Sequence, residues 1–286
     1  MSSAMSSPTM RKFTLPSGQL IPTLGMGTWR MGENARNRQA EIASLQRGME
    51  LGLSLIDTAE MYGEGGAEKV VGEAIASHRS GVFLVSKVYP HNASKKGVIA
   101  ACDRTLARLN TDYLDLYLLH WRGSFPLAET ISAFHALRQA GKIRDYGVSN
   151  FDVDDMKEAL DVPGGELVAT NQILYNLSRR GVELDLLPWC AQRDLPVMAY
   201  SPIEQGRLLN NAVLKQIAKE KEVTAAMVAI AWLLHQENII VIPKASRIEH
   251  IEQNYAALDL TLSAEELARL GTAFPAPVRP IPLQML

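Results

Sequence analysis

The chain has 286 residues, of which 47% are hydrophobic and 21% are charged, and this is the profile of a soluble globular protein. A formal net charge of -2 gives no reason to expect nucleic acid or an anionic membrane as a partner, and no apolar run approaches the roughly 20 residues of a membrane-spanning helix. The two cysteines, Cys102 and Cys190, lie far apart outside any CxxC or Cys/His cluster. We therefore expect no disulfide framework, no metal site and a cytoplasmic location. The modest charge is compatible with a monomer, which is the expected state.

The chain opens with MSSAMSSPTM, which is small and polar and lacks the apolar segment of a secretory signal. Residues 1–10 are predicted to be a disordered leader. The turn sequence PSGQ, residues 16–19, then separates two short strand patterns at residues 13–15 and 20–22. This predicts a β-hairpin before the repeating part of the chain.

From there, apolar strand patterns alternate with amphipathic helix patterns through eight units. The predicted strands cover residues 24–29, 53–56, 82–86, 113–119, 143–148, 167–172, 196–200 and 239–242. The predicted helices cover residues 38–51, 67–77, 95–109, 127–140, 153–160, 185–192, 212–221, 225–235, 248–256 and 264–270. Continuous apolar strands separated by helices are typical of a parallel sheet covered by helices.

Eight strand–helix units in about this length favour a TIM (β/α)8 barrel, with an N-terminal hairpin and an extra C-terminal helix, over a doubly wound sheet. No GxGxxG motif stands between the first strand and helix, which weighs against a Rossmann domain. No linker or change of composition interrupts the series, so residues 11–286 are predicted to be a single α/β domain.

Polar residues follow the apolar strand patterns at the end where TIM barrels carry their active sites. Asp57, Lys87 and His120 follow consecutive strands, and Tyr62 lies in the loop after Asp57. Singly, these residues could be a turn residue, a surface lysine, a core histidine and a packed aromatic. Their occurrence at the same barrel end favours one shared site.

The four side chains suit acid catalysis. A phenol with an ordinary pKa of ~10 is a poor proton donor unless its anion is stabilised. We expect the Lys87 ammonium, held by Asp57, to lower the pKa of Tyr62. His120 could then hydrogen-bond a substrate oxygen that Tyr62 protonates. Because these residues offer no source of electrons, a bound reductant is expected.

Several segments together resemble the aldo-keto reductases, over about residues 13–274. They include GMGTW (25–29), LIDTAEMYGEGGAEKVVGEAI (55–75), YLDLYLLHW (113–121), GKIRDYGVSNF (141–151) and VIPKAS (241–246). Within the family, the chain looks most similar to bacterial reductases of small aldehydes, including methylglyoxal reductases.

The resemblance implies roles for individual residues. Asp57, Tyr62, Lys87 and His120 match the catalytic tetrad of the family. The positions that match the nicotinamide pocket are Ser149, Asn150, Gln172 and Tyr200, although Tyr200 could instead be a core residue. The positions that match the pyrophosphate loop are Ser201, Ile203, Gly206 and Leu208. The positions that match the 2′-phosphate and adenine pockets are Lys244, Ser246, Arg247, Gln253 and Asn254.

The chain departs from the family pattern in two places. Ala245 and His250 stand where NADPH-preferring members often carry Ser and Arg. Lys244 and Arg247 could still clamp a phosphate, so NADPH is the expected cofactor, with NADH also usable; Arg247 as a plain surface charge fits equally well. The loop after the seventh strand and the tail after Phe274, which wall the substrate pocket in the family, are short here, and this predicts an open and less selective pocket.

The predicted substrate residues are Trp29, Met61 and Trp121. The resulting hypothesis is an NADP-dependent oxidoreductase that reduces small aldehydes or 2-oxoaldehydes such as methylglyoxal, with Tyr62 as the general acid. A redox-sensing regulatory subunit that binds the same cofactor is an alternative. A second alternative is a Schiff-base aldolase with Lys87 as the nucleophile, which the nicotinamide-pocket match argues against.

Overall fold

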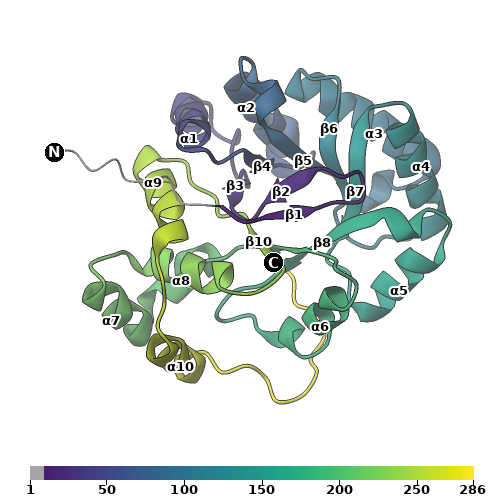
Figure 1. The fold of residues 1–286 in the computed structure, drawn as a ribbon. Helices are drawn as coiled ribbons and strands as arrows, with labels where there is room; N and C mark the ends of the chain where they lie inside the picture. Colours follow the sequence, from purple (N-terminus) through teal and green to yellow (C-terminus); the bar gives the residue numbers. More distant parts are fainter. Residues whose placement is uncertain (1–9) are drawn as a thin grey trace.

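A computed structural model describes residues 10–286, and its centre is a barrel of eight parallel strands (Figure 1). The strands are β3 (Gly25–Gly27), β4 (Leu55–Asp57), β5 (Phe83–Val88), β6 (Leu114–Leu119), β7 (Ile143–Ser149), β8 (Val168–Leu174), β9 (Val197–Tyr200) and β10 (Ile239–Val241). They are hydrogen-bonded in chain order from β3 to β10, as expected when each strand is joined to its neighbour by a helical crossover.

Helices surround the barrel on the outside (Figure 1). They are α1 (Arg38–Leu51), α2 (Gly66–Ile75), α3 (Lys95–Leu109), α4 (Leu127–Gln139), α5 (Val153–Asp161), α6 (Leu186–Ala191), α7 (Ala212–Glu220), α8 (Ala225–Leu234), α9 (Ile248–Ala256) and α10 (Ala264–Ala273). Within the described residues, no helix has the length and apolar character needed to cross a bilayer.

The first and last strands meet and close the barrel. Isolated parallel bridges join Leu24 to Val241 and Gly27 to Lys244. The backbone N–H of Gly27 donates to the carbonyl of Pro243 at 3.0 Å. A Cβ atom at Gly27 would lie 2.8 Å from the carbonyl oxygen of Ile242, so only glycine allows this approach. The prediction of a TIM barrel is confirmed.

A hairpin covers the N-terminal end of the barrel (Figure 1). Its strands, β1 (Lys12–Thr14) and β2 (Leu20–Pro22), pair antiparallel as predicted. Leu15 and Ile21 pack into the apolar interior of the barrel. At the hairpin turn, the backbone N–H of Ser17 donates to the carboxylate of Asp145 on β7 at 3.0 Å. The hairpin leaves the C-terminal end of the barrel uncovered, and a binding site can form there.

The core has an inner and an outer layer. The inner layer fills the barrel with strand residues such as Leu116 and Met198, and the outer layer lies between strands and helices. Both cysteines belong to the outer layer, and burial raises the pKa of Cys102 and of Cys190 to about 12. Cys102 therefore packs as a small buried residue of the hydrophobic core.

All eight predicted strands and ten predicted helices are present, with shifts at their ends. The first strand is shorter than predicted because Thr28 and Trp29 leave the sheet after Gly27. The predicted leader, residues 1–10, lies outside the described residues except for Met10, which packs against the outer core.

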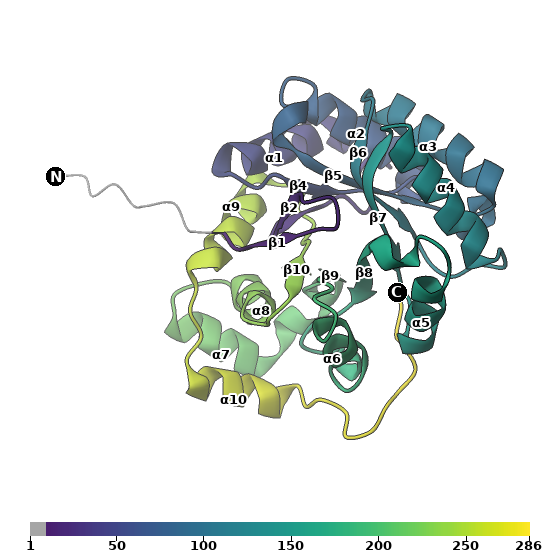
Figure 2. The same cartoon turned by 45° about the vertical axis from the view of Figure 1, so that its right-hand side comes forward.

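The segment after α10 turns back toward the barrel, and Figure 2 shows it passing α6 and ending near α5. The guanidinium of Arg180 donates to the carbonyl of Phe274 at 2.7 Å, where this tail begins. Farther along, Ile281 packs so closely on Gly181 that a Cβ atom there would lie 2.8 Å from it. Contacts with Arg180 and Gly181, which are distant from the tail in the sequence, therefore guide its path.

Candidate active site

A cavity of about 570 Å³ opens at the C-terminal end of the barrel. Loops from several strands contribute its walls, as expected for this fold. Among the predicted residues, those that line it are Trp29, Asp57, Met61, Tyr62, His120, Trp121, Ser149, Asn150, Gln172, Tyr200, Ser201, Ile203 and Lys244. The structure thus brings together side chains that are up to 215 positions apart, from Trp29 to Lys244 (244 − 29).

Lys87 lies beneath the cavity and is fully buried. Its ammonium donates to Asp57 Oδ2 at 2.7 Å, to the carbonyl of Thr58 at 2.9 Å and to the hydroxyl of Tyr62 at 3.3 Å. An ammonium has three N–H bonds, so each has an acceptor. The second carboxylate oxygen of Asp57 accepts from Gln172 Nε2 at 2.8 Å. Asp57 therefore holds Lys87 in place, and each of its carboxylate oxygens has a donor.

The backbone conformation of the residues after Tyr62 determines the path of its loop. Gly63, Glu64 and Gly65 follow Tyr62 with φ values of 56°, 51° and 86°. Three consecutive left-handed residues reverse the chain tightly, and glycine occupies two of these positions because it adopts positive φ without a steric cost. The reversal brings Tyr62 over the barrel end before α2 begins at Gly66.

The pKa of Tyr62 is raised well above its ordinary value of 10.0, first by burial and then by the negative charge of Asp57. The net lowering of this pKa expected from Lys87 is not found, because burial and Asp57 both raise it. Tyr62 consequently keeps its proton at neutral pH, as an acid must. The contact with Lys87 can stabilise the phenolate once that proton has left.

His120 is a neutral imidazole at neutral pH. Burial, followed by the positive charge of Lys87, lowers its pKa well below 6.5. Its ring lies edge-on to Tyr62, with centroids 5.8 Å apart. Nδ1 is buried and has no hydrogen-bond partner within residues 10–286. A proton on Nδ1 would be an unpaired buried donor, so the favoured tautomer carries the proton on Nε2. The Nε2–H group can then donate a hydrogen bond to a molecule in the cavity.

The polar groups predicted for the nicotinamide pocket form a continuous hydrogen-bonded strip. Tyr200 donates to Asn150 Oδ1 at 2.9 Å, and Asn150 Nδ2 donates to Ser149 Oγ at 3.2 Å. Ser149 Oγ in turn donates to the backbone carbonyl of Gln172 at 2.8 Å. These mutual bonds fix the orientation of amide and hydroxyl groups along one wall of the cavity.

A buried carboxylate holds the loop that carries Ser201 and Ile203. Glu204 accepts from Arg179 at 2.6 Å and from Asn176 at 2.8 Å. Hydrogen bonds and the charge of Arg179 together keep the pKa of Glu204 below its ordinary value of 4.5, although burial acts in the opposite direction.

Six predicted cofactor residues are not among those that line the cavity: Gly206, Leu208, Ser246, Arg247, Gln253 and Asn254. Leu208 is buried in the outer core. Lys244 Nζ donates to Ser246 Oγ at 3.2 Å, so Ser246 lies beside Lys244 at the cavity edge. Arg247 is exposed, and its guanidinium lies 2.9 Å from His250 Nε2.

Sequence reasoning missed Arg30, which lines the cavity beside Lys244. Its guanidinium lies over the ring of Trp29, 4.4 Å from the centroid, and its φ is 64°. Arg30 adds to the lowering of the pKa of Lys244 that burial causes. The available signal was its position directly after Trp29, at the end of the first strand.

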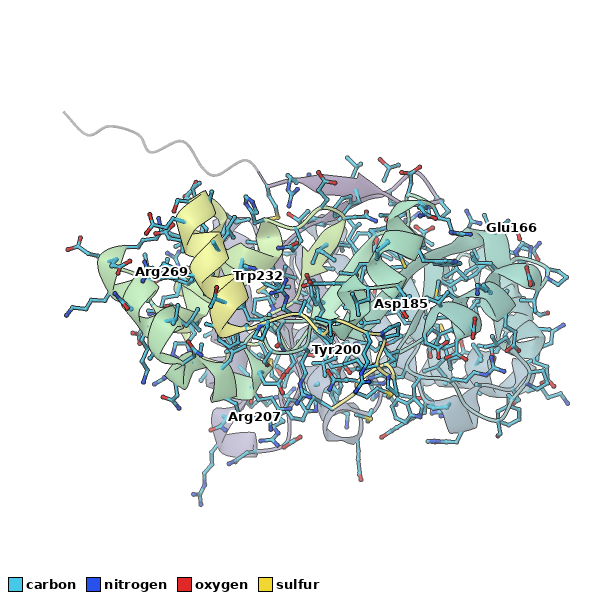
Figure 3. All side chains as sticks on the ribbon, turned by 90° about the horizontal axis from the view of Figure 1, so that it is seen from below. Glu166, Asp185, Tyr200, Arg207, Trp232 and Arg269 are labelled. Carbon is cyan, nitrogen blue, oxygen red and sulfur yellow. The ribbon has the colours of Figure 1, made fainter. Side chains whose placement is uncertain are left out.

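The tail also reaches the site, where Met285 and Leu286 line the cavity. Figure 3 shows Tyr200 close to the yellow C-terminal segment, and a backbone hydrogen bond from Leu286 opposes the rise in the pKa of Tyr200 that burial causes. The short tail thus contributes to the cavity wall, and the open, less selective pocket stays a prediction. No local sequence pattern marks a contact between positions this far apart.

The sequence pattern that defines the Aldo/keto reductase family matches residues 23–273. The chain belongs to this family. The family and oxidoreductase predictions made from the resemblance are thereby confirmed. This aldo-keto reductase is 55% identical over 271 residues to methylglyoxal reductase YeaE of Escherichia coli K12, covering 93% of this chain and 95% of the relative. It is 34% identical over 269 residues to the glyoxal reductase of Bacillus subtilis 168, covering 92% and 93%.

Among solved structures, this aldo-keto reductase matches one from Klebsiella pneumoniae in complex with NADP and acetate. The TM-score is 0.94 at 49% identity, covering 97% of this chain and 100% of the other. A second structure, of an aldo-keto reductase from Klebsiella pneumoniae in complex with NADPH, matches with the same score, identity and coverage.

Proposed function

We propose that this aldo-keto reductase uses NADPH to reduce small aldehydes and 2-oxoaldehydes, such as methylglyoxal, to alcohols. The observation that carries this proposal is the contact of buried Lys87 with both Asp57 and Tyr62, beside a neutral His120 at the cavity. The relatives named as methylglyoxal and glyoxal reductases support this substrate class. None of these relatives favours a regulatory subunit.

The cavity residues fit a nicotinamide nucleotide. The oriented amides of Asn150 and Gln172 suit a carboxamide, and the ring of Tyr200 offers a stacking surface. Lys244 and Arg30 place positive charge at the cavity edge, where phosphate would be stabilised. The residues proposed to hold the cofactor are Ser149, Asn150, Gln172, Tyr200, Ser201, Ile203, Gly206, Leu208, Lys244, Ser246, Arg247, Gln253 and Asn254. When bound, NADPH supplies a hydride; NADH lacks the 2′-phosphate and would bind with fewer contacts.

The protein's own groups then stabilise the negative charge that develops on the substrate oxygen and protonate it. His120 Nε2–H donates to the carbonyl oxygen and orients it. As negative charge develops there, the Tyr62 hydroxyl transfers its proton to that oxygen. Lys87 Nζ–H stabilises the resulting phenolate, and Asp57 with the carbonyl of Thr58 keeps the ammonium in position. Trp29, Met61 and Trp121 surround the substrate with apolar surface and reduce the access of water.

The test follows NADPH absorbance after addition of methylglyoxal and a panel of small aldehydes. We expect turnover by the wild type and a fall in kcat of about 10²- to 10⁴-fold for Tyr62→Phe, because the proton donor is lost. Tyr113→Phe is the matched control, since Tyr113 precedes β6 at the opposite end of the barrel and should leave kcat unchanged.

Full activity of Tyr62→Phe would contradict the role of Tyr62 as the general acid. Absence of turnover with every aldehyde would contradict the proposed reductase activity. A borohydride-trapped adduct on Lys87 with an aldol substrate would support the Schiff-base alternative instead.

We also propose that the enzyme is a monomer and works in the cytoplasm, in line with its modest charge and its two unpaired cysteines. Light scattering of the purified protein at enzyme-assay concentrations tests the first part. A mass near twice that of the chain would contradict it.

A further inference from the structure

Two carboxylates flank Tyr62 in the sequence and are buried behind it. Glu60 stands two residues before Tyr62, and Glu68 stands six residues after it on α2. Glu60 is 8% exposed and Glu68 is 0% exposed. Burial of a charged group is unfavourable unless it is paired, so both must have partners that the fold provides.

Glu68 links α2 to the strand that carries Lys87. One of its oxygens accepts from the hydroxyl of Ser86 at 2.6 Å, and Ser86 directly precedes Lys87 on β5. The other oxygen accepts from the Nε of Arg108, which lies on α3. The start of α2 is thereby tied to β5 and α3 at the same point.

Arg108 packs directly on the reversing loop after Tyr62. A Cβ atom at Gly65 would lie 2.5 Å from Arg108 Cδ, so the arginine side chain rests on the backbone of the loop. Its guanidinium also donates to Thr105 Oγ1 at 3.3 Å and lies 4.0 Å from a carboxylate oxygen of Glu60. One cation therefore contacts Gly65 and lies close to both carboxylates that flank Tyr62.

Glu60 fixes the other end of the same loop. Its Oε1 accepts from the backbone N–H of Tyr89 at 2.8 Å and from Asn92 Nδ2 at 2.9 Å. Its Oε2 lies 3.7 Å from the guanidinium of Arg104. Glu60 thus joins the segment before Tyr62 to the loop that follows β5.

A close glycine contact supports the opposite side of the loop. A Cβ atom at Gly66 would lie 2.7 Å from the carbonyl oxygen of Gly32, and one at Gly63 would lie 3.1 Å from that of Met31. The carboxylate of Glu41 accepts from the N–H of Gly32 at 2.9 Å and holds this second loop. The Tyr62 loop is therefore confined between Gly32 on one side and Arg108 on the other.

We propose that Arg108, Glu60 and Glu68, together called the Arg108 cluster, position the Tyr62 hydroxyl within hydrogen-bonding reach of Lys87. The three consecutive left-handed residues after Tyr62 allow the loop to reverse but do not fix where the phenol stands. The contacts of the cluster supply that restraint from α3 and β5. This inference rests on the proposed role of Tyr62 as the acid, and the members of the cluster are positioning residues that do not touch the substrate.

The first test is Arg108→Gln, which removes the guanidinium with its charge and its donor to Glu68. We expect kcat with methylglyoxal to fall roughly 10- to 100-fold, because small displacements of a catalytic group have effects of this size. The KM for the aldehyde and the Kd for NADPH, measured by its fluorescence on binding, should stay within about twofold of wild type. A loss of structure elsewhere would change the Kd as well.

Arg108→Gln leaves Glu68 buried without its cation, and the variant could fail to fold. The double variant E68Q/R108Q leaves no unpaired buried charge and should show the same fall in kcat. The matched control is E73Q/R38Q, because Glu73 lies on the same helix and its ion pair with Arg38, at 2.7 Å, is exposed and away from Tyr62. The control should keep kcat within about twofold.

Two further measurements separate positioning from general stability. In a Tyr62→Phe background, E68Q/R108Q should cause no additional fall in kcat, because the cluster acts through the Tyr62 hydroxyl. A crystal structure of E68Q/R108Q should show the Tyr62 hydroxyl beyond about 3.5 Å from Lys87 Nζ. If the hydroxyl stays in contact with Lys87, the positioning proposal is wrong, whatever the kinetics. If wild type reduces no aldehyde, the proposed function fails, and the crystal structure still decides the positioning role.

Discussion

Each end of the barrel buries an aspartate, and the two aspartates have different partners. Asp145, at the N-terminal end, is 1% exposed, and its carboxylate accepts hydrogen bonds from Ser17 and Gln19 of the hairpin. Asp57, at the C-terminal end, is 2% exposed and pairs with Lys87 and Gln172. Asp145 forms no ion pair within the described part of the chain.

The comparison shows that burial alone does not distinguish a functional carboxylate from a structural one. At the N-terminal end, neutral donors from a turn satisfy the carboxylate. At the C-terminal end, the carboxylate holds an ammonium whose remaining donor contacts a phenol at the cavity wall. The partner decides what the aspartate can do.

The largest expected effect comes from breaking the Asp57–Lys87 pair. Lys87→Met should lower kcat by about 10³-fold or more, because the phenolate loses its stabilising cation. It should also lower the free energy of unfolding by about 3 to 5 kcal/mol, since Asp57 is left buried without its partner. Kinetics and urea unfolding measure the two effects.

A double variant separates these two consequences. Lys87→Met with Asp57→Asn should regain part of the stability, because no unpaired charge remains, while kcat stays low. Recovery of both quantities together would mean that the pair supports only the fold.

A smaller effect, on stability alone, is expected at the opposite end. Asp145→Asn weakens the acceptor for the hairpin turn and should lower the free energy of unfolding by about 1 to 3 kcal/mol. The kcat should remain within about twofold of wild type, since the hairpin lies at the end away from the cavity. A fall in kcat as large as that of Lys87→Met would remove the contrast between the two ends.

The smallest effect concerns the pH dependence of stability. The folded-state pKa of His120 is well below 6.5, so below pH 6.5 the unfolded chain binds a proton that the folded chain does not. The contribution of His120 to stability is complete above that pH and decreases as the pH falls, by at most about 1.4 kcal/mol per pH unit. His120→Gln should therefore lose less stability than wild type between about pH 7 and 5.5 in urea unfolding. Equal losses in the two proteins would mean that His120 titrates normally.

The sequence predicted the fold well because each element carries its own signal. Apolar strand patterns, helical periodicity and the PSGQ turn depend on neighbouring residues, and the barrel follows from their regular alternation. Placing Asp57, Lys87 and His120 at strand ends then predicted their convergence, since parallel strands share one C-terminal edge.

What the sequence could not predict depends on contacts between distant elements. The bond between Gln172 and Asp57 and the arrival of Leu286 at the cavity have no local pattern. The direction of the Tyr62 pKa shift also required the structure, because it depends on the burial of the phenol and on its closeness to Asp57. Charge type can be seen in a sequence, but desolvation cannot.

The burial of both thiols has a consequence for the proposed reduction of electrophilic aldehydes. Small aldehydes and 2-oxoaldehydes react with thiolates, and a thiolate is the nucleophilic form of cysteine. Cys102 and Cys190 are each 0% exposed, and pKa values of about 12 keep them protonated at neutral pH. The proposed substrates therefore meet no reactive cysteine sulfur on the described surface, and the fold protects both thiols from covalent modification by these compounds.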